Sequence, residues 1–290
     1  MIAALGADTP EISSAVTALV VKQHDVGVGI IIGSNIFNLA ALLGLSALVA
    51  GRLPVRRQAI IFNGAISLIV TMVMMFSIFG FISPLVSVVL LVLLLVPYVV
   101  VSGLKLNQMK RWKLPERVGE FLIPSIASTR HASKGQKLVL WKSRSGAWLG
   151  GVALVLIIVT SMGLTRSAIF LSAAWGMNKI IVGMLVLAVL TSIPNVITTM
   201  KLALDGRGIA VMSEALNSNT INVLFGICVP ATILGLGTLA RQTIFSIWWL
   251  IGMTMINLCL LYFKKGFNRM SGAINVGMYS MFAIILNVWK

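Results

Sequence analysis

Two short polar motifs interrupt the apolar first part of the chain. Residues 6–11 read GADTPE and residues 33–38 read GSNIFN. Between them they offer carboxylate, hydroxyl and amide oxygens, which are the ligands that hard cations such as Ca²⁺ and Na⁺ prefer. A carboxylate inside a membrane costs at least about 2.5–3.5 kcal/mol. Asp8 and Glu11 are therefore the first candidates for a functional site.

The same pattern returns 184 residues later. Pro10 then corresponds to Pro194 and Glu11 to Asn195, and the spacing from proline to the Ser-Asn pair is the same in both copies. Polar, helix-breaking motifs at matching positions of two hydrophobic halves are typical of a transporter binding site. We therefore predict one cation site built from both copies. Its candidate ligands are Asp8, Thr9, Glu11, Ser34, Asn35, Asn38, Thr191, Ser192, Asn195, Ser218, Asn219 and Asn222.

The individual residues leave alternatives open. Glu11 is either the central anionic ligand or an acid at a helix end that reaches interface water. Asp8 either supplies a second negative charge or caps a helix. The hydroxyl and amide side chains either complete an oxygen cage or join membrane helices by hydrogen bonds. Three further acids, near predicted loops or helix starts, are expected to be solvated or capping groups: Asp25, Asp205 and Glu214.

The two prolines suggest how the helices would present these groups. Proline donates no backbone hydrogen bond and clashes with the carbonyl four residues earlier. Pro10 and Pro194 are therefore expected to break their helices and to free backbone carbonyls for the ion.

The elements that must position the site are membrane helices. Hydrophobic residues make up 58% of the 290 residues and charged residues only 10%, and the apolar runs are about 20 residues long, which spans a bilayer. The chain is predicted to be an all-α, polytopic membrane protein whose partner is the lipid bilayer. We expect nine segments, at about 1–21, 26–50, 58–80, 84–103, 147–170, 179–204, 209–235, 242–263 and 270–289.

The distribution of positive charge orients these segments. Eighteen of the 23 Lys and Arg residues fall in alternate loops, which the positive-inside rule places in the cytoplasm. This explains the net charge of +16 without a nucleic-acid partner. The two motif copies then enter the membrane from opposite sides, as an inverted repeat. The predicted parts are a first half (1–103), a basic cytoplasmic linker (104–146), which is either solvated or a short interfacial helix, and a second half (147–290).

At this spacing the motifs resemble the α-repeats of the cation/Ca²⁺ exchanger superfamily, of the sodium/calcium exchanger type. The resemblance implies ten helices, with repeats on helices 2–3 and 7–8, and usually one glutamate from each half at the ion. This sequence has nine segments and lacks the first. It carries Asn195 and Asn222 where acids are usual, and Asp8 where a serine is usual.

We therefore expect a secondary antiporter that exchanges Ca²⁺ for Na⁺ or H⁺ by alternating access and uses no cofactor. If only Glu11 carries charge, a monovalent cation or proton antiporter fits better. A transport-dead membrane scaffold or regulator is the third reading. The sequence shows no enzyme motif, such as a nucleophile elbow or a Gly-rich phosphate loop, at a fitting position. It gives no indication of the oligomeric state.

Overall fold

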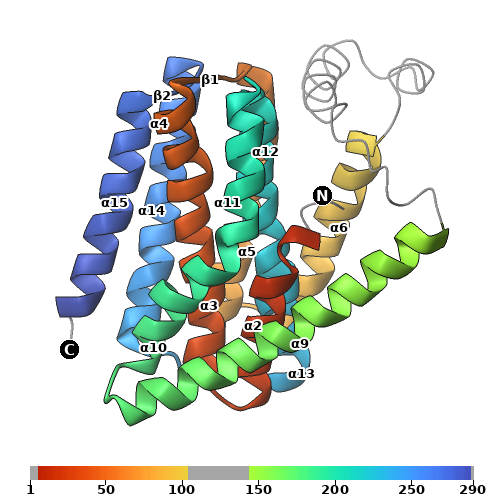
Figure 1. The fold of residues 1–290 in the computed structure, drawn as a ribbon, viewed down its shortest axis with the longest axis vertical. Coiled ribbons are helices and arrows are strands. Elements are labelled where there is room, and N and C mark those ends of the chain that lie inside the picture. The colour runs from red at the N-terminus through yellow and green to blue at the C-terminus, as the bar shows by residue number, and fades with distance from the viewer. Residues whose placement is uncertain (1–5, 104–143, 289–290) are drawn as a thin grey trace.

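Long apolar helices run side by side along most of the molecule (Figure 1). The structure is a computed structural model that describes residues 6–103 and 144–288. Within these residues, seven helical stretches are long and apolar enough to cross a membrane, and a shorter apolar helix covers residues 84–100. The protein is an integral membrane protein with an all-helical fold.

The helices of the first half follow the predicted segments closely. In chain order this half contains α2 (Thr9–Val20), α3 (His24–Asn38), η1 (Leu39–Leu45), α4 (Ser46–Ala50), β1 (Arg52–Pro54), α5 (Arg57–Ile78) and α6 (Pro84–Gly103).

The second half repeats this arrangement after α9. It contains α9 (Arg144–Ala174), α10 (Lys179–Ile181), η3 (Val182–Leu187), α11 (Ala188–Leu204), α12 (Gly208–Ile221), η4 (Asn222–Cys228), α13 (Val229–Leu234), α14 (Arg241–Lys264), β2 (Gly266–Asn268) and α15 (Arg269–Val288). The predicted segments from 26–50 onward coincide with helical stretches. The first, 1–21, contains the 12-residue helix α2, and its residues 1–5 lie outside the described residues. Apart from the first residues of α9, the predicted linker lies outside the described residues.

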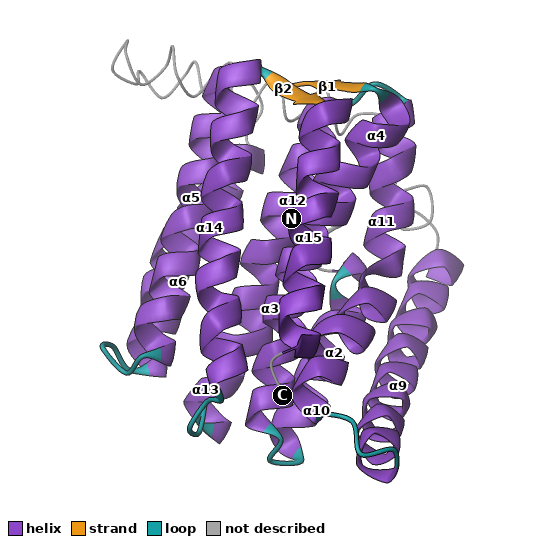
Figure 2. Cartoon of the chain, turned by 90° about the vertical axis from the view of Figure 1, so that its left-hand side faces the viewer, coloured by secondary structure: helices purple, strands orange, loops and turns teal. Residues whose placement is uncertain are grey.

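Burial separates a central helix from a peripheral one. The span that starts with α3 is 94% buried, whereas the span of α9 is only 11% buried. Figure 2 shows α9 at one edge of the bundle and α5 and α6 at the other. Since the exposed faces of α9 and α6 carry large apolar side chains such as Phe170 and Leu93, they are suited to lipid contact.

Close approach of α3 to the second half depends on glycine. A Cβ atom added at Gly33 would lie 2.2 Å from the carbonyl oxygen of Met184, so only glycine allows η3 to lie this close. Gly44 has the same role on the other side of the bundle, where an added Cβ would lie 2.9 Å from the Cβ atom of Asn275.

The two prolines do not act alike. Pro10 lies in the first turn of α2, directly after a turn at Asp8, where proline is well tolerated. Pro194 lies inside α11, which continues to Leu204, so the predicted helix break at Pro194 is wrong. Figure 1 shows the α10–α11 segment changing direction along its length.

Within residues 6–103 and 144–288 the irregular backbone lies elsewhere, in three π-helical segments. Two of them occupy corresponding places: η1 starts directly after Asn38, and η4 starts at Asn222. π-helical turns are rare and often occur at functional sites. Their position next to the last asparagine of each motif was not predicted.

A small ribbon joins the two halves at one end of the bundle. Strand β1 pairs antiparallel with β2, with Leu53 opposite Phe267, and both side chains are buried. The ribbon lies at the top of Figure 1, while the turns that precede α3 and α14 lie at the bottom. No strand was predicted here.

Candidate ion-binding site

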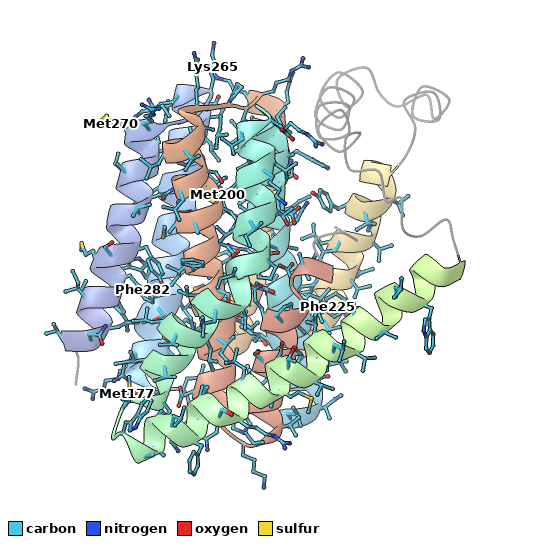
Figure 3. The ribbon with its side chains drawn as sticks, in the orientation of Figure 1. Met177, Met200, Phe225, Lys265, Met270 and Phe282 are labelled. Atoms are coloured by element: carbon cyan, nitrogen blue, oxygen red, sulfur yellow. The ribbon has the colours of Figure 1, made fainter. Side chains whose placement is uncertain are left out.

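Both acids of the first motif lie in the interior. Asp8 and Glu11 are each 0% exposed. This excludes the alternative in which Glu11 reaches interface water. Asp8 stands at the N-cap position of α2, but its side chain makes no capping hydrogen bond, so the capping alternative also fails. Figure 3 shows that side chains fill the space between α2, α3, α11 and α12.

The partners of Asp8 come from the second half. Its Oδ1 atom accepts hydrogen bonds from Asn195 Nδ2 at 2.7 Å and from Ser218 Oγ at 2.5 Å. Asn195 lies in α11 and Ser218 in α12. These bonds compensate part of the cost of burying the carboxylate, because a charged group accepts stronger hydrogen bonds than a neutral one.

Glu11 also accepts its hydrogen bonds from the second half of the chain. Ser192 Oγ donates to its Oε1 atom, and Asn222 Nδ2 donates to its Oε2 atom at 2.7 Å. Both donors again belong to the second half. The first half thus contributes the two negative charges, and the second half contributes neutral donors.

The second part of the site joins α3 to α12. Asn35 Nδ2 donates to the carbonyl oxygen of Asn219 at 3.2 Å, and Asn219 Nδ2 donates to the carbonyl oxygen of Asn35 at 3.1 Å. Asn38 Nδ2 donates to Asn219 Oδ1 at 3.3 Å and Asn222 Nδ2 to Asn35 Oδ1 at 3.1 Å. Asn38 also donates to Ser218 Oγ at 3.0 Å.

These contacts have an approximate two-fold symmetry. A shift of 184 residues carries Asp8 to Ser192 and Glu11 to Asn195. The Asp8–Asn195 pair and the Glu11–Ser192 pair therefore change places under this shift. The symmetry is incomplete, because Ser218 bonds to Asp8 and Asn38 whereas its counterpart Ser34 has no hydrogen-bond partner among the described residues. The charge is also unequal between the halves.

Several oxygens in this network are buried and have no hydrogen-bond partner among the described residues. They are Asp8 Oδ2, Asn38 Oδ1, Asn195 Oδ1 and Asn222 Oδ1, and the hydroxyl of Ser34, the residue before Asn35, is also buried without such a partner. An unpaired buried polar atom costs about 1–3 kcal/mol, so these atoms call for an explanation. Oxygen atoms of these types are ligands for a hard cation.

Not every predicted ligand joins this network. The Thr191 hydroxyl donates to the Leu187 carbonyl oxygen at 2.8 Å, within its own helical segment. Thr9 is partly exposed at the first residue of α2, next to Asp8. The cross-repeat hydrogen bonds to the two carboxylates described above come from asparagine and serine side chains.

Two buried hydroxyl residues on the same helices as the site were not among the predicted ligands. Ser14 and Thr199 are both 0% exposed, and neither hydroxyl has a partner among the described residues. Ser14 follows Glu11 by three residues and Thr199 follows Asn195 by four, which places each pair on one helix face. This spacing was the available signal.

The remaining acids divide into three cases. Asp25 Oδ1 accepts from the Ala240 amide at 2.7 Å and from Thr243 Oγ1 at 3.0 Å, so Asp25 caps the start of α14 as expected. Asp205 is exposed directly after α11. Glu214 corrects the prediction, because it is half-buried in the middle of α12 and its charge interacts with that of Asp8.

The type of site follows from this inventory. Within residues 6–103 and 144–288, no three or more His, Cys, Asp or Glu side chains form a group that could hold a metal ion. The network instead combines two carboxylates with neutral amide and hydroxyl oxygens. Such a donor set suits a cation that binds and leaves better than a tightly held structural metal.

Comparison with known protein families gives a match over most of the chain. The family described as sodium/calcium exchanger protein matches residues 1–106 and 145–288. A relative named "Putative antiporter CaxA", from Alkalimonas amylolytica, is 24% identical over 250 residues, which cover 82% of this chain and 68% of that protein. Sodium/potassium/calcium exchanger 4 of Mus musculus is 41% identical over 49 residues, only 17% of this chain and 8% of that protein.

Solved structures share the fold. The structure of native YfkE has a TM-score of 0.64 at 13% identity and covers 97% of this chain and 81% of its own. The H⁺/Ca²⁺ exchanger CAX has a TM-score of 0.62 at 12% identity and covers 99% of this chain and 75% of its own. At these identities the likeness concerns the fold alone.

Proposed function

The chain belongs to the sodium/calcium exchanger protein family, and from this premise we propose that it exchanges Ca²⁺ for Na⁺ or H⁺ across a membrane. The family consists of transporters and not of enzymes. The observation that carries the proposal is the set of buried oxygens without hydrogen-bond partners around Asp8 and Glu11.

The two carboxylates favour a divalent cation as the substrate. Both are fully buried, and both accept hydrogen bonds from the second half of the chain. Two negative charges match one Ca²⁺, whereas Glu11 alone would suit a monovalent cation or a proton. In this proposal Asp8 supplies the charge that Asn195 does not provide.

The division of the ligands between the halves supports alternating access. The carboxylates lie on α2, and their hydrogen-bond donors lie on α11, α12 and η4. A displacement of one half relative to the other would change the ligand set on both sides of the ion together. This is the behaviour expected of inverted repeats that meet at one central site.

We also propose an orientation. The end that carries the β1–β2 ribbon is cytoplasmic, because the flanking segments contain Arg52, Arg207, Lys264, Lys265 and Arg269. The 104–146 linker would then be cytoplasmic as well. The proposed partners are the lipid bilayer and the transported cations.

The test is ⁴⁵Ca²⁺ uptake into proteoliposomes under an imposed Na⁺ or H⁺ gradient. Wild type should take up Ca²⁺, and both Glu11→Gln and Asp8→Ser should abolish uptake. Asp205→Asn is the matched control, because Asp205 is an exposed acid outside the network. Loss in Glu11→Gln alone would support the single-carboxylate alternative, and no uptake by folded wild type would support the transport-dead alternative.

A further inference from the structure

A second polar cavity lies at the end of the bundle opposite the β1–β2 ribbon. Its volume is about 490 Å³, and it is lined by residues 22–26, 178–180 and 237–238. These residues belong to the first turns of α3 and α10 and to the connections that precede α3, α10 and α14. In Figure 1 all three connections lie at the lower end of the molecule.

The charged groups around the cavity favour an anion. Lys22, His24 and Lys179 line it, and Asp25 is the acid among the lining residues. The Asp25 carboxylate is already engaged, since the Ala240 amide and Thr243 donate to it. Two lysines and an imidazole therefore face the cavity beside one carboxylate that is turned to α14.

The backbone at Lys22 indicates that its side chain serves a purpose. Lys22 has a φ of 61°, in the left-handed region where glycine is favoured. Its hydrogen bonds, from Lys22 N to Leu19 O and from Gln23 N to Ala18 O, are those of a helix end that usually carries glycine. The repeat places Gly206 at the corresponding position, with a φ of 71°.

The cavity itself has no counterpart at the corresponding place in the second repeat. The shift of 184 residues carries His24 to Gly208. There, an added Cβ atom would lie 2.6 Å from the Pro54 carbonyl oxygen, because β1 packs directly on Gly208. Backbone fills that space, whereas the space beside His24 remains a cavity.

One imidazole nitrogen supports the same conclusion. His24 Nδ1 is enclosed and has no hydrogen-bond partner among the described residues. The polar side chains of Gln23, Asn178 and Thr238 also line the cavity and can donate hydrogen bonds. Cationic groups combined with several neutral donors form the usual environment of a phosphate group.

We propose that this cavity binds a phosphate-bearing anion through Lys22, Lys179 and His24. The phosphate comes either from the headgroup of an anionic lipid or from free phosphate in solution. By the charge distribution, Lys22 and Lys179 are two of only five basic residues on this side of the membrane. Their convergence on one cavity is the central observation. The proposal is independent of the transport function.

The test measures thermal unfolding of the full chain in neutral detergent. Inorganic phosphate is added in one series, and phosphatidylglycerol or phosphatidylcholine in another. A ligand 100-fold above its Kd should raise Tm by roughly 5 °C. The variants are Lys22→Gly, which suits the backbone conformation, and Lys179→Gln. Lys201→Gln is the control, because Lys201 is exposed near the C-terminal end of α11, away from the cavity.

The outcomes separate the two sources. A rise with phosphatidylglycerol but not with inorganic phosphate identifies a lipid headgroup, and a rise with inorganic phosphate identifies a free anion. In both cases Lys22→Gly and Lys179→Gln should lose most of the rise, and Lys201→Gln should keep it. No rise in wild type, or an equal rise in all variants, would overturn the proposal.

Discussion

Asn35 and Asn219 exchange hydrogen bonds, each side-chain amide donating to the backbone carbonyl of the other, at 3.2 and 3.1 Å. The two residues are related by the shift of 184 residues, so this pair lies where the two repeats face each other symmetrically. It fixes the crossing of α3 and α12 and thereby the positions of Asn38, Ser218 and Asn222 beside it.

The reciprocal pair predicts coupled effects of substitution. Asn35→Ala and Asn219→Ala should each destabilise the protein, and the double variant should lose less than the sum. Interhelical hydrogen bonds in membranes contribute about 0.6 kcal/mol on average, with a maximum of about 1.7. A double-mutant cycle on unfolding in detergent measures this. Asn287→Ala is the control, because Asn287 is exposed and bonds to Ala283 in its own helix. Full additivity would contradict the pairing.

Swapping the two side chains of the Asp8–Asn195 pair should restore part of the Ca²⁺ uptake that is lost when the Asp8 charge is removed. Asp8→Asn alone should lower ⁴⁵Ca²⁺ uptake at least about tenfold, since hydrogen bonds to charged groups are worth about 1.5–3 kcal/mol. Combining it with Asn195→Asp returns one carboxylate to the same contact, now from α11. Uptake by the double variant should exceed that of Asp8→Asn. If the double variant takes up no more Ca²⁺ than Asp8→Asn alone, the carboxylate must be in the first half of the chain, and its presence in the pair is not sufficient.

Substitution of Gly33 should separate α3 from η3. Gly33→Ala would place a Cβ atom 2.2 Å from the Met184 carbonyl oxygen, so the helices must move apart. Overpacking of this kind typically costs about 1–3 kcal/mol. We expect a lower Tm and reduced uptake. Gly277→Ala is the matched control, because nothing lies within 4 Å of its added Cβ. If both variants behave like wild type, the close approach is not needed for stability.

The hydroxyl of Tyr98 joins three helices. It lies 2.8 Å from Asn63 Oδ1 and 2.9 Å from Asn217 Oδ1, and its single proton can be donated to one of them at a time. These contacts connect α6 with α5 and with the residue before Ser218. Tyr98→Phe should cost about 1–3 kcal/mol, because it removes a partner from buried amides. Unfolding in detergent measures this loss. Tyr279→Phe, which keeps the ring contact with Phe37, is the control and should behave like wild type.

The helices could be predicted from the sequence, because membrane helices require long apolar runs. Polar residues inside those runs also indicated most members of the hydrogen-bond network, but not Ser14 and Thr199. The 184-residue repeat also identified Asn35 and Asn219 as equivalent residues, and these two residues contact each other in the structure. What could not be predicted depends on packing between distant segments. The β1–β2 ribbon pairs residues more than 200 positions apart, and the fate of Pro194 depends on neighbouring helices.

The roles of the two acids show the same limit. Sequence reasoning could not decide whether Asp8 caps a helix, because that depends on where Asn195 and Ser218 lie in space. It also grouped Glu214 with solvated or capping acids, although the start of α12 was predicted to within one residue, because its half-buried place near Asp8 depends on how α12 packs. The network of cross-repeat hydrogen bonds required the three-dimensional arrangement.

The unequal distribution of acids bears on how the halves could have arisen. If two copies of the first half paired around the same axis, the interior would hold four carboxylates, two from each copy of Asp8 and Glu11. Two copies of the second half would hold none at these positions, because Ser192 and Asn195 replace them. Neither homodimer would reproduce this site. The acids of one half and the neutral donors of the other therefore complement each other, and each half needs the other to form this interior.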